Sequence, residues 1–369
     1  MATQTEVLVP LWTPPTFSAG KVPLVTPARS GGRDIEGDFP LDQIFKLTIG
    51  FYFRLDLPPG TEVLSCERYG ASAWTVTAKI TVTLADGEPK LYFLKCAEEA
   101  QGKAMLEGEF NSMVELYRTC PDTVPKPYAW GRLDISNPDT YYFLCDFIEM
   151  SDISPDPIHL ATKLVQLHQA SKSPTGMFGF HIDTCQGNLP QRTAWNPSWV
   201  DFYIQLVRGA MALNKERNGN WKNLEQLVDR LITHVVPQVL GPLEADGQVV
   251  KPTLIHGDLW DGNVGTSLEN GELYFFDASV YYAHNEMEIA MWRARFCKTL
   301  SAKVYLNSYL NQMGISEPVE QFDDRNRIYS CYMTLHESAC HNGSSFREEC
   351  YENLNYLVNK YAPLPEETI

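Results

Sequence analysis

The sequence predicts an α+β fold of two lobes: a small lobe of mostly antiparallel strands with one helix, and a larger helical lobe. Three observations predict it. The length of 369 residues exceeds what one small core needs. Residues 62–150 carry alternating, β-branched segments, and most later segments repeat apolar residues at helical spacing. We therefore expect an irregular, Pro-rich arm at 1–47, a first lobe at 48–150 and a second lobe at 151–369.

The first lobe is predicted to run strand, strand, helix, strand, strand. The stretch "TVTAKITVTLADG" (75–87) alternates and ends in Asp-Gly, and "KLYFLKCA" (90–97) follows, which indicates a β-hairpin. Residues 103–120 have helical periodicity. Two further strands are expected at 124–133 and 140–150. The apolar residues expected on one face of the helix are Leu106, Phe110, Met113, Val114 and Tyr117.

The second lobe is predicted to be helical around one strand–loop–strand unit. That unit combines "TLIHGDLWDGNVG" (253–265) with "ELYFFDASV" (272–280). The segments expected to be helical are 159–171, 199–213, 223–236, 285–296, about 301–312, and 346–361.

Composition excludes some classes of protein. The net charge of −16 argues against nucleic-acid binding and is compatible with cationic substrates such as amines. No apolar run approaches 18 residues and the first residues do not resemble a secretory signal, so no membrane span is expected. Nine scattered cysteines indicate reduced thiols. We therefore expect a cytoplasmic protein.

The segment "HGDLWDGN" (256–263) carries the strongest chemical signal. In kinase catalytic loops, the pattern H-x-D-x-x-x-x-N places the Asp on the attacking hydroxyl and the Asn on Mg²⁺. Asp258 and Asn263 have that separation, and His256 is expected to brace the loop. Asp277 ends an apolar strand, where a carboxylate is costly unless it is paired or binds a metal. Asn263 and Asp277 are therefore predicted Mg²⁺ ligands, although a polar surface loop with an Asx-turn is the alternative.

A kinase also needs a Lys for the ATP phosphates and a Glu that holds this Lys. Lys95 ends the apolar strand "LYFLK", and Glu109 in the following helix is a better partner than Glu107 because it flanks the buried stripe. Two solvated surface charges are the alternative. The loop that covers the nucleotide is expected at Gly70 and Ser72, where small residues allow a phosphate to approach the backbone amides.

These motifs resemble the aminoglycoside phosphotransferase and choline kinase-like group and, more narrowly, the fructosamine-3-kinase family. Trp260 in "HGDLWDGN", "FGFHIDTCQGNLPQRTAWNPSWVDFY" and "FFDASVYYAHNEMEIAM" carry the narrower resemblance, which spans about residues 60–360. It implies a kinase that transfers the γ-phosphoryl of ATP to the 3-hydroxyl of a ketosamine, free or on protein, and thereby frees the amine. By this resemblance Asp258 is the base, and Trp260, His284 and Glu286 are the substrate residues, with Trp260 flanking the sugar and His284 and Glu286 near or below the substrate loop.

The sequence departs from the family pattern in three places. Ala278-Ser279 replaces Pro-Ala after the metal ligand, Asp261 adds a charge beside the expected substrate site, and Tyr69-Gly70-Ala71-Ser72 replaces the usual phosphate loop, with Cys66 only nearby. These departures leave open a kinase of the same fold that acts on another hydroxyl metabolite. A non-catalytic binding module is disfavoured because Lys95 and the acids are retained.

Other residues have simpler interpretations. His168 is expected to be a helix-end histidine, Trp199 a core residue and Glu288 a member of a structural ion pair. The group Cys331, His336, Cys340 and His341 lacks zinc spacing.

Overall fold

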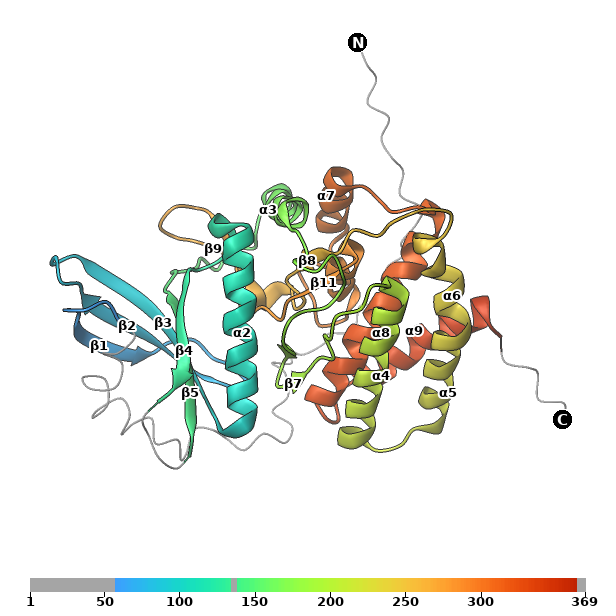
Figure 1. Ribbon diagram of the computed structural model, residues 1–369, viewed down its shortest axis with the longest axis horizontal. Coiled ribbons are helices and arrows are strands. Elements are labelled where there is room, and N and C mark those ends of the chain that lie inside the picture. The colour runs from blue at the N-terminus through green and yellow to red at the C-terminus, as the bar shows by residue number, and fades with distance from the viewer. Residues whose placement is uncertain (1–56, 134–137, 364–369) are drawn as a thin grey trace, which may run out of the picture.

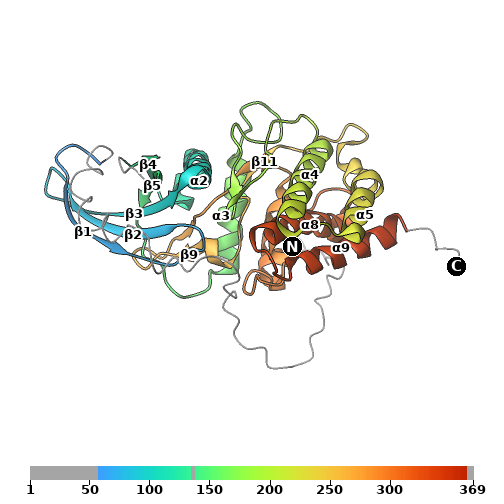
Figure 2. The same ribbon diagram turned by 90° about the horizontal axis from the view of Figure 1, so that it is seen from below.

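The computed structural model describes residues 57–133 and 138–363. Figures 1 and 2 show a sheet at one end of the molecule and a bundle of helices at the other. The predicted arm at 1–47 lies outside the described residues. Leu57, which is the first described residue, is buried in the core of the sheet lobe.

The small lobe is a five-stranded antiparallel sheet with one helix. The strand order is β1-β2-β3-β5-β4. The predicted hairpin is confirmed as β2 and β3, and Gly87 in its turn has φ +89°. The bounds are β1 Glu62–Arg68, β2 Val76–Thr83, β3 Pro89–Glu98, α2 Glu99–Thr119, β4 Pro127–Arg132 and β5 Thr140–Asp146.

Two details of this lobe were predicted wrongly. Strand β1 was missed, because "EVLSCER" has no clear alternation and much of it is exposed at the sheet edge. The buried face of α2 includes Leu106, Met113 and Leu116, whereas Val114 is 37% exposed. Because this face packs against β3 and β5, Leu116 rather than Val114 is buried.

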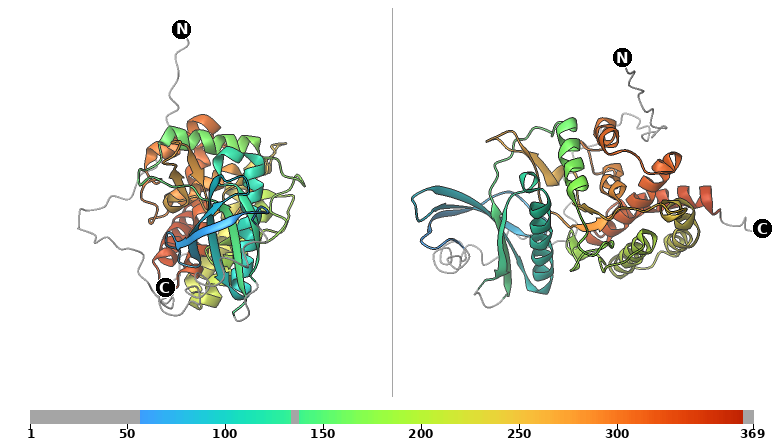
Figure 3. Two further views of the ribbon diagram at one scale, coloured as in Figure 1. Left: turned by 90° about the vertical axis from the view of Figure 1, so that its left-hand side faces the viewer. Right: turned by 45° about the horizontal axis from the view of Figure 1, so that its top comes forward.

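Among the described residues, the large lobe contains most of the helices and six short strands, which pair two by two. Figure 3 shows α3 beside α2, where the two lobes meet. The helices are α3 Pro157–Ala170, α4 Trp199–Asn218, α5 Lys222–Arg230, a π-helix at Leu231–Val235, α6 Val236–Val239, α7 Lys303–Met313, α8 Phe322–Cys340 and α9 Phe346–Tyr361. Short 3₁₀ helices are at Pro121–Thr123, Gly241–Glu244, Asp261–Asn263, Asn285–Arg293 and Val319–Gln321. The strands are β6 Cys185–Gln186, β7 Leu189–Pro190, β8 Thr253–Ile255, β9 Val264–Thr266, β10 Leu273–Phe275 and β11 Tyr281–Ala283.

Helix α8 is the centre of this lobe and was missed by the sequence analysis. It packs against α4 and α9, and polar residues such as Arg325, Thr334 and Glu337 are buried along it together with apolar ones. A helix buried on nearly all sides has no polar stripe, so its periodicity is weak. The segment 285–296, predicted as an α-helix, is a 3₁₀ helix at Asn285–Arg293.

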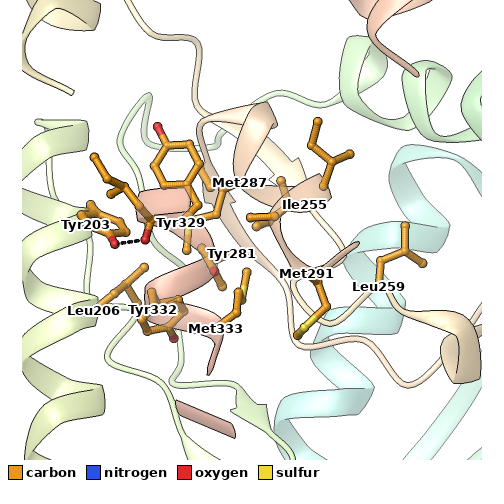
Figure 4. Packing of buried hydrophobic residues seen from close by; sticks show 14 of the residues in the cluster. Tyr203, Leu206, Ile255, Leu259, Tyr281, Met287, Met291, Tyr329, Tyr332 and Met333 are labelled. Atoms are coloured by element: carbon orange, nitrogen blue, oxygen red, sulfur yellow. Dashed lines mark hydrogen bonds between the residues drawn. The ribbon is translucent and has the colours of Figure 1, made fainter. Parts of the chain in front are cut away.

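The core of the large lobe includes hydroxyl groups that bond within it. Figure 4 shows Tyr203 and Tyr329 beside Met333 and Tyr332. The Tyr329 hydroxyl lies 3.0 Å from the indole Nε1 of Trp199, which donates to it, and 2.9 Å from Nδ1 of His284. Trp199 is fully buried, which confirms the predicted core role. Within the described residues, no helix is both long enough and apolar enough to cross a membrane.

Tyr329→Phe should lower the free energy of unfolding by about 1–3 kcal/mol, because the Trp199 indole N–H would lose its buried acceptor. Urea unfolding of purified protein measures this change. The control is Tyr356→Phe, whose ring is 45% exposed and should change stability by less than about 0.5 kcal/mol. Equal stability of the two variants would contradict a structural role for the Tyr329 hydroxyl.

Candidate active site

The predicted catalytic loop lies between two strand pairs. Strand β8 pairs with β11 and β9 pairs with β10, so the segments 256–263 and 276–280 lie next to each other. Figure 1 shows β8 and β11 between α2 and α8. At Gly257, where φ is +80°, a Cβ atom would lie 2.3 Å from the carbonyl oxygen of Ser279. Only glycine therefore fits this approach without strain.

A buried carboxylate holds the backbone of this loop. Glu288 is 1% exposed and accepts hydrogen bonds from the amides of His256 (2.5 Å) and Gly257 (3.2 Å). Its Oε2 also lies 3.4 Å from Nε2 of His168, whose Nδ1 contacts the Tyr309 hydroxyl. The structural roles predicted for Glu288 and His168 are confirmed, and for Glu288 the main partners are backbone amides rather than a charged side chain.

His256 braces the loop from inside, as predicted. Its Nε2 lies 3.0 Å from the Phe276 carbonyl oxygen, and its Nδ1 accepts from the Asp258 amide at 3.3 Å. Burial lowers the pKa of His256, although Glu288 acts in the opposite direction. A neutral ring that donates through Nε2 and accepts through Nδ1 satisfies both contacts.

Asp258 and Asn263 are brought together by the turn of the loop. The Asn263 side-chain Nδ2 donates to the Asp258 carbonyl oxygen (2.8 Å) and carboxylate Oδ2 (3.0 Å). Burial raises the pKa of Asp258 well above its usual value. The negative charges of Glu337, Asp277 and Glu288 raise it further, and the Asn263 hydrogen bond opposes them. A carboxylate with a raised pKa is a stronger base than an exposed one.

Lys95 and Glu109 form the predicted ion pair across the small lobe. Lys95 Nζ lies 2.8 Å from Glu109 Oε1 and also pairs with Asp277 Oδ1 from the large lobe. Burial alone would lower the pKa of Lys95, but Asp277 and Glu109 outweigh it and raise this pKa. Burial raises the pKa of Glu109, and the Lys95 ammonium opposes this effect. Lys95 therefore stays charged at neutral pH.

Asn263 and Asp277 fit a magnesium ion by their chemistry. Because Asn263 donates through Nδ2 to Asp258, its amide oxygen is the atom that remains for a ligand. Asp277 has φ +59°, which is uncommon for a residue other than glycine, and its side chain is 41% exposed. Mg²⁺ takes oxygen ligands and commonly binds through one or two protein groups plus phosphate oxygens and water. Within residues 57–133 and 138–363, no three His, Cys, Asp or Glu side chains gather as a metal site, so a cation here depends on such oxygens.

The predicted nucleotide loop lies at the tip between β1 and β2. Gly70 has φ +77° and is exposed. The Ser72 hydroxyl accepts from the amides of Trp74 (3.3 Å) and Thr75 (3.2 Å). The Ser72 side chain therefore shapes the turn, and any phosphate contact by Ser72 would come from its backbone amide.

Trp260 packs at the edge of the loop. Its ring lies against Gly262, where a Cβ atom would be 2.6 Å from the indole, and it meets Phe296 edge-on at 5.4 Å between centroids. It is half-buried. One part of the indole is thus fixed by packing, and its role beside a sugar stays a prediction.

His284 and Glu286 are both buried in the protein interior, which contradicts a direct contact with substrate from the substrate role implied by the resemblance. His284 is 3% exposed and bonds to Tyr329 and Ser316, and burial lowers its pKa to about 4. Glu286 is fully buried in a two-oxygen ion pair with Arg325 (2.8 and 3.0 Å). Both side chains support the segment behind the loop.

The expectation that Asp261 adds a charge beside the substrate site is also wrong. The Asp261 carboxylate accepts from the backbone amides of Lys298, Thr299 and Leu300 and from the Cys297 thiol. The negative charge of Asp261 therefore fixes the 297–300 segment and is not free to face a substrate.

Three residues with buried or aromatic side chains were not singled out from the sequence: Glu337, Gln186 and Trp74. Glu337 on α8 is 7% exposed, and its Oε1 accepts from Gln186 Nε2 at 2.9 Å. Trp74 packs on His341 with 5.3 Å between ring centroids. No sequence pattern singled out Glu337 or Gln186, because α8 was not recognised as a helix and each strand of the 185–190 hairpin has only two residues.

Gly257→Ala should lower the free energy of unfolding by about 1–3 kcal/mol from its left-handed backbone alone, with the Ser279 overlap adding to this. Thermal or urea unfolding measures the change. Gly241→Ala is the control, because Gly241 has no positive φ and nothing lies within 4 Å of its Cβ position. A Gly257→Ala protein as stable as the control would show that the loop can move away from Ser279.

Comparisons with known proteins identify relatives of this chain. The family model "Fructosamine kinase" matches residues 73–360. A protein-ribulosamine 3-kinase from Oryza sativa subsp. japonica is 32% identical over 63% of this chain and 63% of that protein, so the chain spans less than two thirds of that relative's length. The mouse ketosamine-3-kinase is 28% identical over 54% of this chain and 68% of its own length.

Solved structures share the fold. A candidate fructosamine-3-kinase from Thermobifida fusca superposes with a TM-score of 0.63 at 20% identity, covering 81% of this chain and 95% of that one. A thermostable mutant of an aminoglycoside phosphotransferase, in a ternary complex with AMP-PNP and hygromycin B, has a TM-score of 0.53 at 14% identity over 81% of this chain and 94% of that one. These superpositions show a kinase-like fold, which confirms the predicted α+β, two-lobed class. Because the family model covers most of the chain and the catalytic-loop residues lie together, the protein belongs to the fructosamine kinase family.

Proposed function

We propose that the protein is an ATP-dependent kinase that phosphorylates a sugar hydroxyl of a ketosamine, either a small molecule or a glycated protein. The observation that carries the proposal is the assembly of Lys95, Glu109, Asp258, Asn263 and Asp277 from four separate segments. The names of the rice and mouse relatives support a ribulosamine or fructosamine type of acceptor. Phosphorylation of the 3-hydroxyl would then lead to deglycation.

Each of these residues has a task in the transfer. Lys95 would bind the α- and β-phosphates of ATP, and Glu109 holds the ammonium in place. Asn263 and Asp277 would hold Mg²⁺, which neutralises charge on the phosphates when bound. In the present arrangement Asp277 Oδ1 pairs with Lys95, so nucleotide binding would exchange this contact for contacts with the phosphates and the metal.

Asp258 would act on the acceptor hydroxyl. The hydroxyl oxygen forms a bond to the γ-phosphorus, the bond from that phosphorus to the ADP oxygen breaks, and the hydroxyl proton goes to the Asp258 carboxylate. The hydrogen bond from Asn263 orients this carboxylate, and Glu288 fixes the backbone that carries it. Gly70 and Ser72 would cover the phosphates through backbone amides, and Trp260 would flank the sugar.

A reducing compartment such as the cytoplasm is the proposed location. All nine cysteines are unpaired in the structure, and structural disulfides are rare where thiols are kept reduced. The rice relative is named a chloroplastic protein, which describes that protein.

A panel of acceptors tests the proposed activity. Purified protein with ATP and Mg²⁺ is incubated with a fructosamine, a ribulosamine, an aminoglycoside and choline, and ADP release is measured together with the phosphorylated product. We expect turnover of a ketosamine and a phosphate on its 3-hydroxyl. Turnover of only the other alcohols would replace the proposed acceptor class, and no ADP release with any acceptor would contradict a ketosamine kinase.

Asp258→Asn should lower kcat by about 10²–10⁴-fold, because the residue loses its proton-accepting group. The affinity for an ATP analogue in Mg²⁺ should stay close to that of the unchanged protein, because Asp258 is not among the proposed phosphate contacts. Steady-state kinetics and calorimetry measure the two quantities. Unchanged kcat would remove Asp258 from the mechanism.

A further inference from the structure

We infer that Glu337, with Gln186 and Trp74, forms an amine-binding subsite that recognises the cationic nitrogen of the acceptor. This inference rests on the proposed function, because it specifies which part of a ketosamine the site selects. It concerns side chains that the sequence analysis did not single out and that do not take part in phosphoryl transfer.

Glu337 lies on α8 and reaches the segment 184–186. Its Oε1 accepts from Gln186, and the neighbouring Thr184 hydroxyl is 3.4 Å from the Ser279 carbonyl oxygen. That same carbonyl oxygen is the atom against which Gly257 packs, one residue before Asp258. The segment 184–186 thus bonds to Glu337 at one residue and to the strand end that packs on the loop at another. The effect of the Glu337 charge on Asp258, second only to burial in raising its pKa, is consistent with this proximity.

The charge on Glu337 has no strong cationic partner among the residues that the structure describes. Its two partners are the Gln186 amide and His341, whose Nε2 is 3.4 Å from Oε2. Neither partner is a Lys or an Arg. A buried carboxylate is costly unless a donor or an opposite charge compensates it, so this position favours a ligand that brings positive charge.

Gln186 supplies a second, independent sign of a missing donor. It is fully buried, and its Oε1 has no hydrogen-bond partner, although its Nε2 is bonded to Glu337. The two atoms belong to one amide, so Oε1 is bonded to the same carbon as the nitrogen that donates to Glu337. Rotating the amide would bring its oxygen against the carboxylate, which is unfavourable. The open atoms here are acceptors, and an ammonium with several N–H donors matches them.

Trp74 adds an aromatic face from the small lobe. Its ring packs on His341, and its Nε1 would be 3.7 Å from a Cβ atom at Gly187, the residue after Gln186. Trp74 also lines a small pocket with Glu98 and Asn188, whose Oε1 and Oδ1 atoms likewise lack partners. The face of a Trp attracts cations, so the aromatic ring and the carboxylate favour the same ligand.

The chemistry of a ketosamine suits this arrangement. Its amine is on C1 and the hydroxyl to be phosphorylated is on C3, so a group that binds the amine lies close to the base. An ammonium beside Glu337 would offset the charge of this buried carboxylate.

The test compares two acceptors that differ in one charge. The first is 1-deoxy-1-propylamino-fructose, a cationic amine, and the second is 1-O-propyl-fructose, its neutral ether. Calorimetry with a non-hydrolysable ATP analogue and Mg²⁺ measures the Kd of each for the full chain. We expect the unchanged protein to bind the amine at least tenfold more tightly than the ether, and Glu337→Gln to remove this preference without weakening nucleotide binding.

The control variant is Glu115→Gln, which removes a charge from a carboxylate of similar burial (9% exposed) in α2 and should keep the preference. Trp74→Leu should reduce the preference, which adds a second variant if Glu337→Gln is unstable. Equal binding of amine and ether by the unchanged protein, or a preference kept in Glu337→Gln, would overturn the inference. Because binding is measured, this result is separate from the turnover panel: a preference for the amine without turnover would contradict only the proposed activity.

Discussion

The rest of the site depends on the ion pairs that the Lys95 ammonium makes with Glu109 and Asp277. These ion pairs join strand β3 and helix α2 of the small lobe to the segment after β10 in the large lobe. A buried ammonium is costly without opposite charges, and these two carboxylates compensate it. Each of the three residues therefore fixes the position of the other two, and the lobes are aligned at the place where phosphate chemistry would occur.

Beneath the loop, buried polar groups hold the loop backbone and its neighbouring segments in place through hydrogen bonds and ion pairs. Glu288 holds two loop amides, and Glu286 of the same 3₁₀ segment forms an ion pair with Arg325 of α8. Removing one partner of a fully buried ion pair typically costs about 3–5 kcal/mol, because the other charge stays buried. Asp261 similarly binds three successive amides at 298–300. Polar residues that looked like substrate contacts in the sequence thus hold backbone.

The accuracy of the sequence interpretation followed the strength of the local pattern. The hairpin of β2 and β3 alternated clearly, and α9 had a clear amphipathic period, so both were predicted. Helix α8 was missed because it is buried on nearly all sides, and the 3₁₀ form of 285–293 was missed because apolar spacing does not distinguish it from an α-helix. The pairing of Lys95 with Glu109 rather than Glu107 was predicted from the stripe that Leu106 and Phe110 define.

The sequence by itself determined the candidate catalytic residues, because the spacing of Asp258 and Asn263 and the positions of Lys95, Glu109 and Asp277 are local or follow one strand or helix. Only the tertiary structure decided which of the other polar residues are buried supports. His284 and Glu286 bond within the core and Glu337 bonds to Gln186, since these partners come from segments more than 30 residues apart. Local spacing carries no information about such distant contacts, so packing alone could assign these roles.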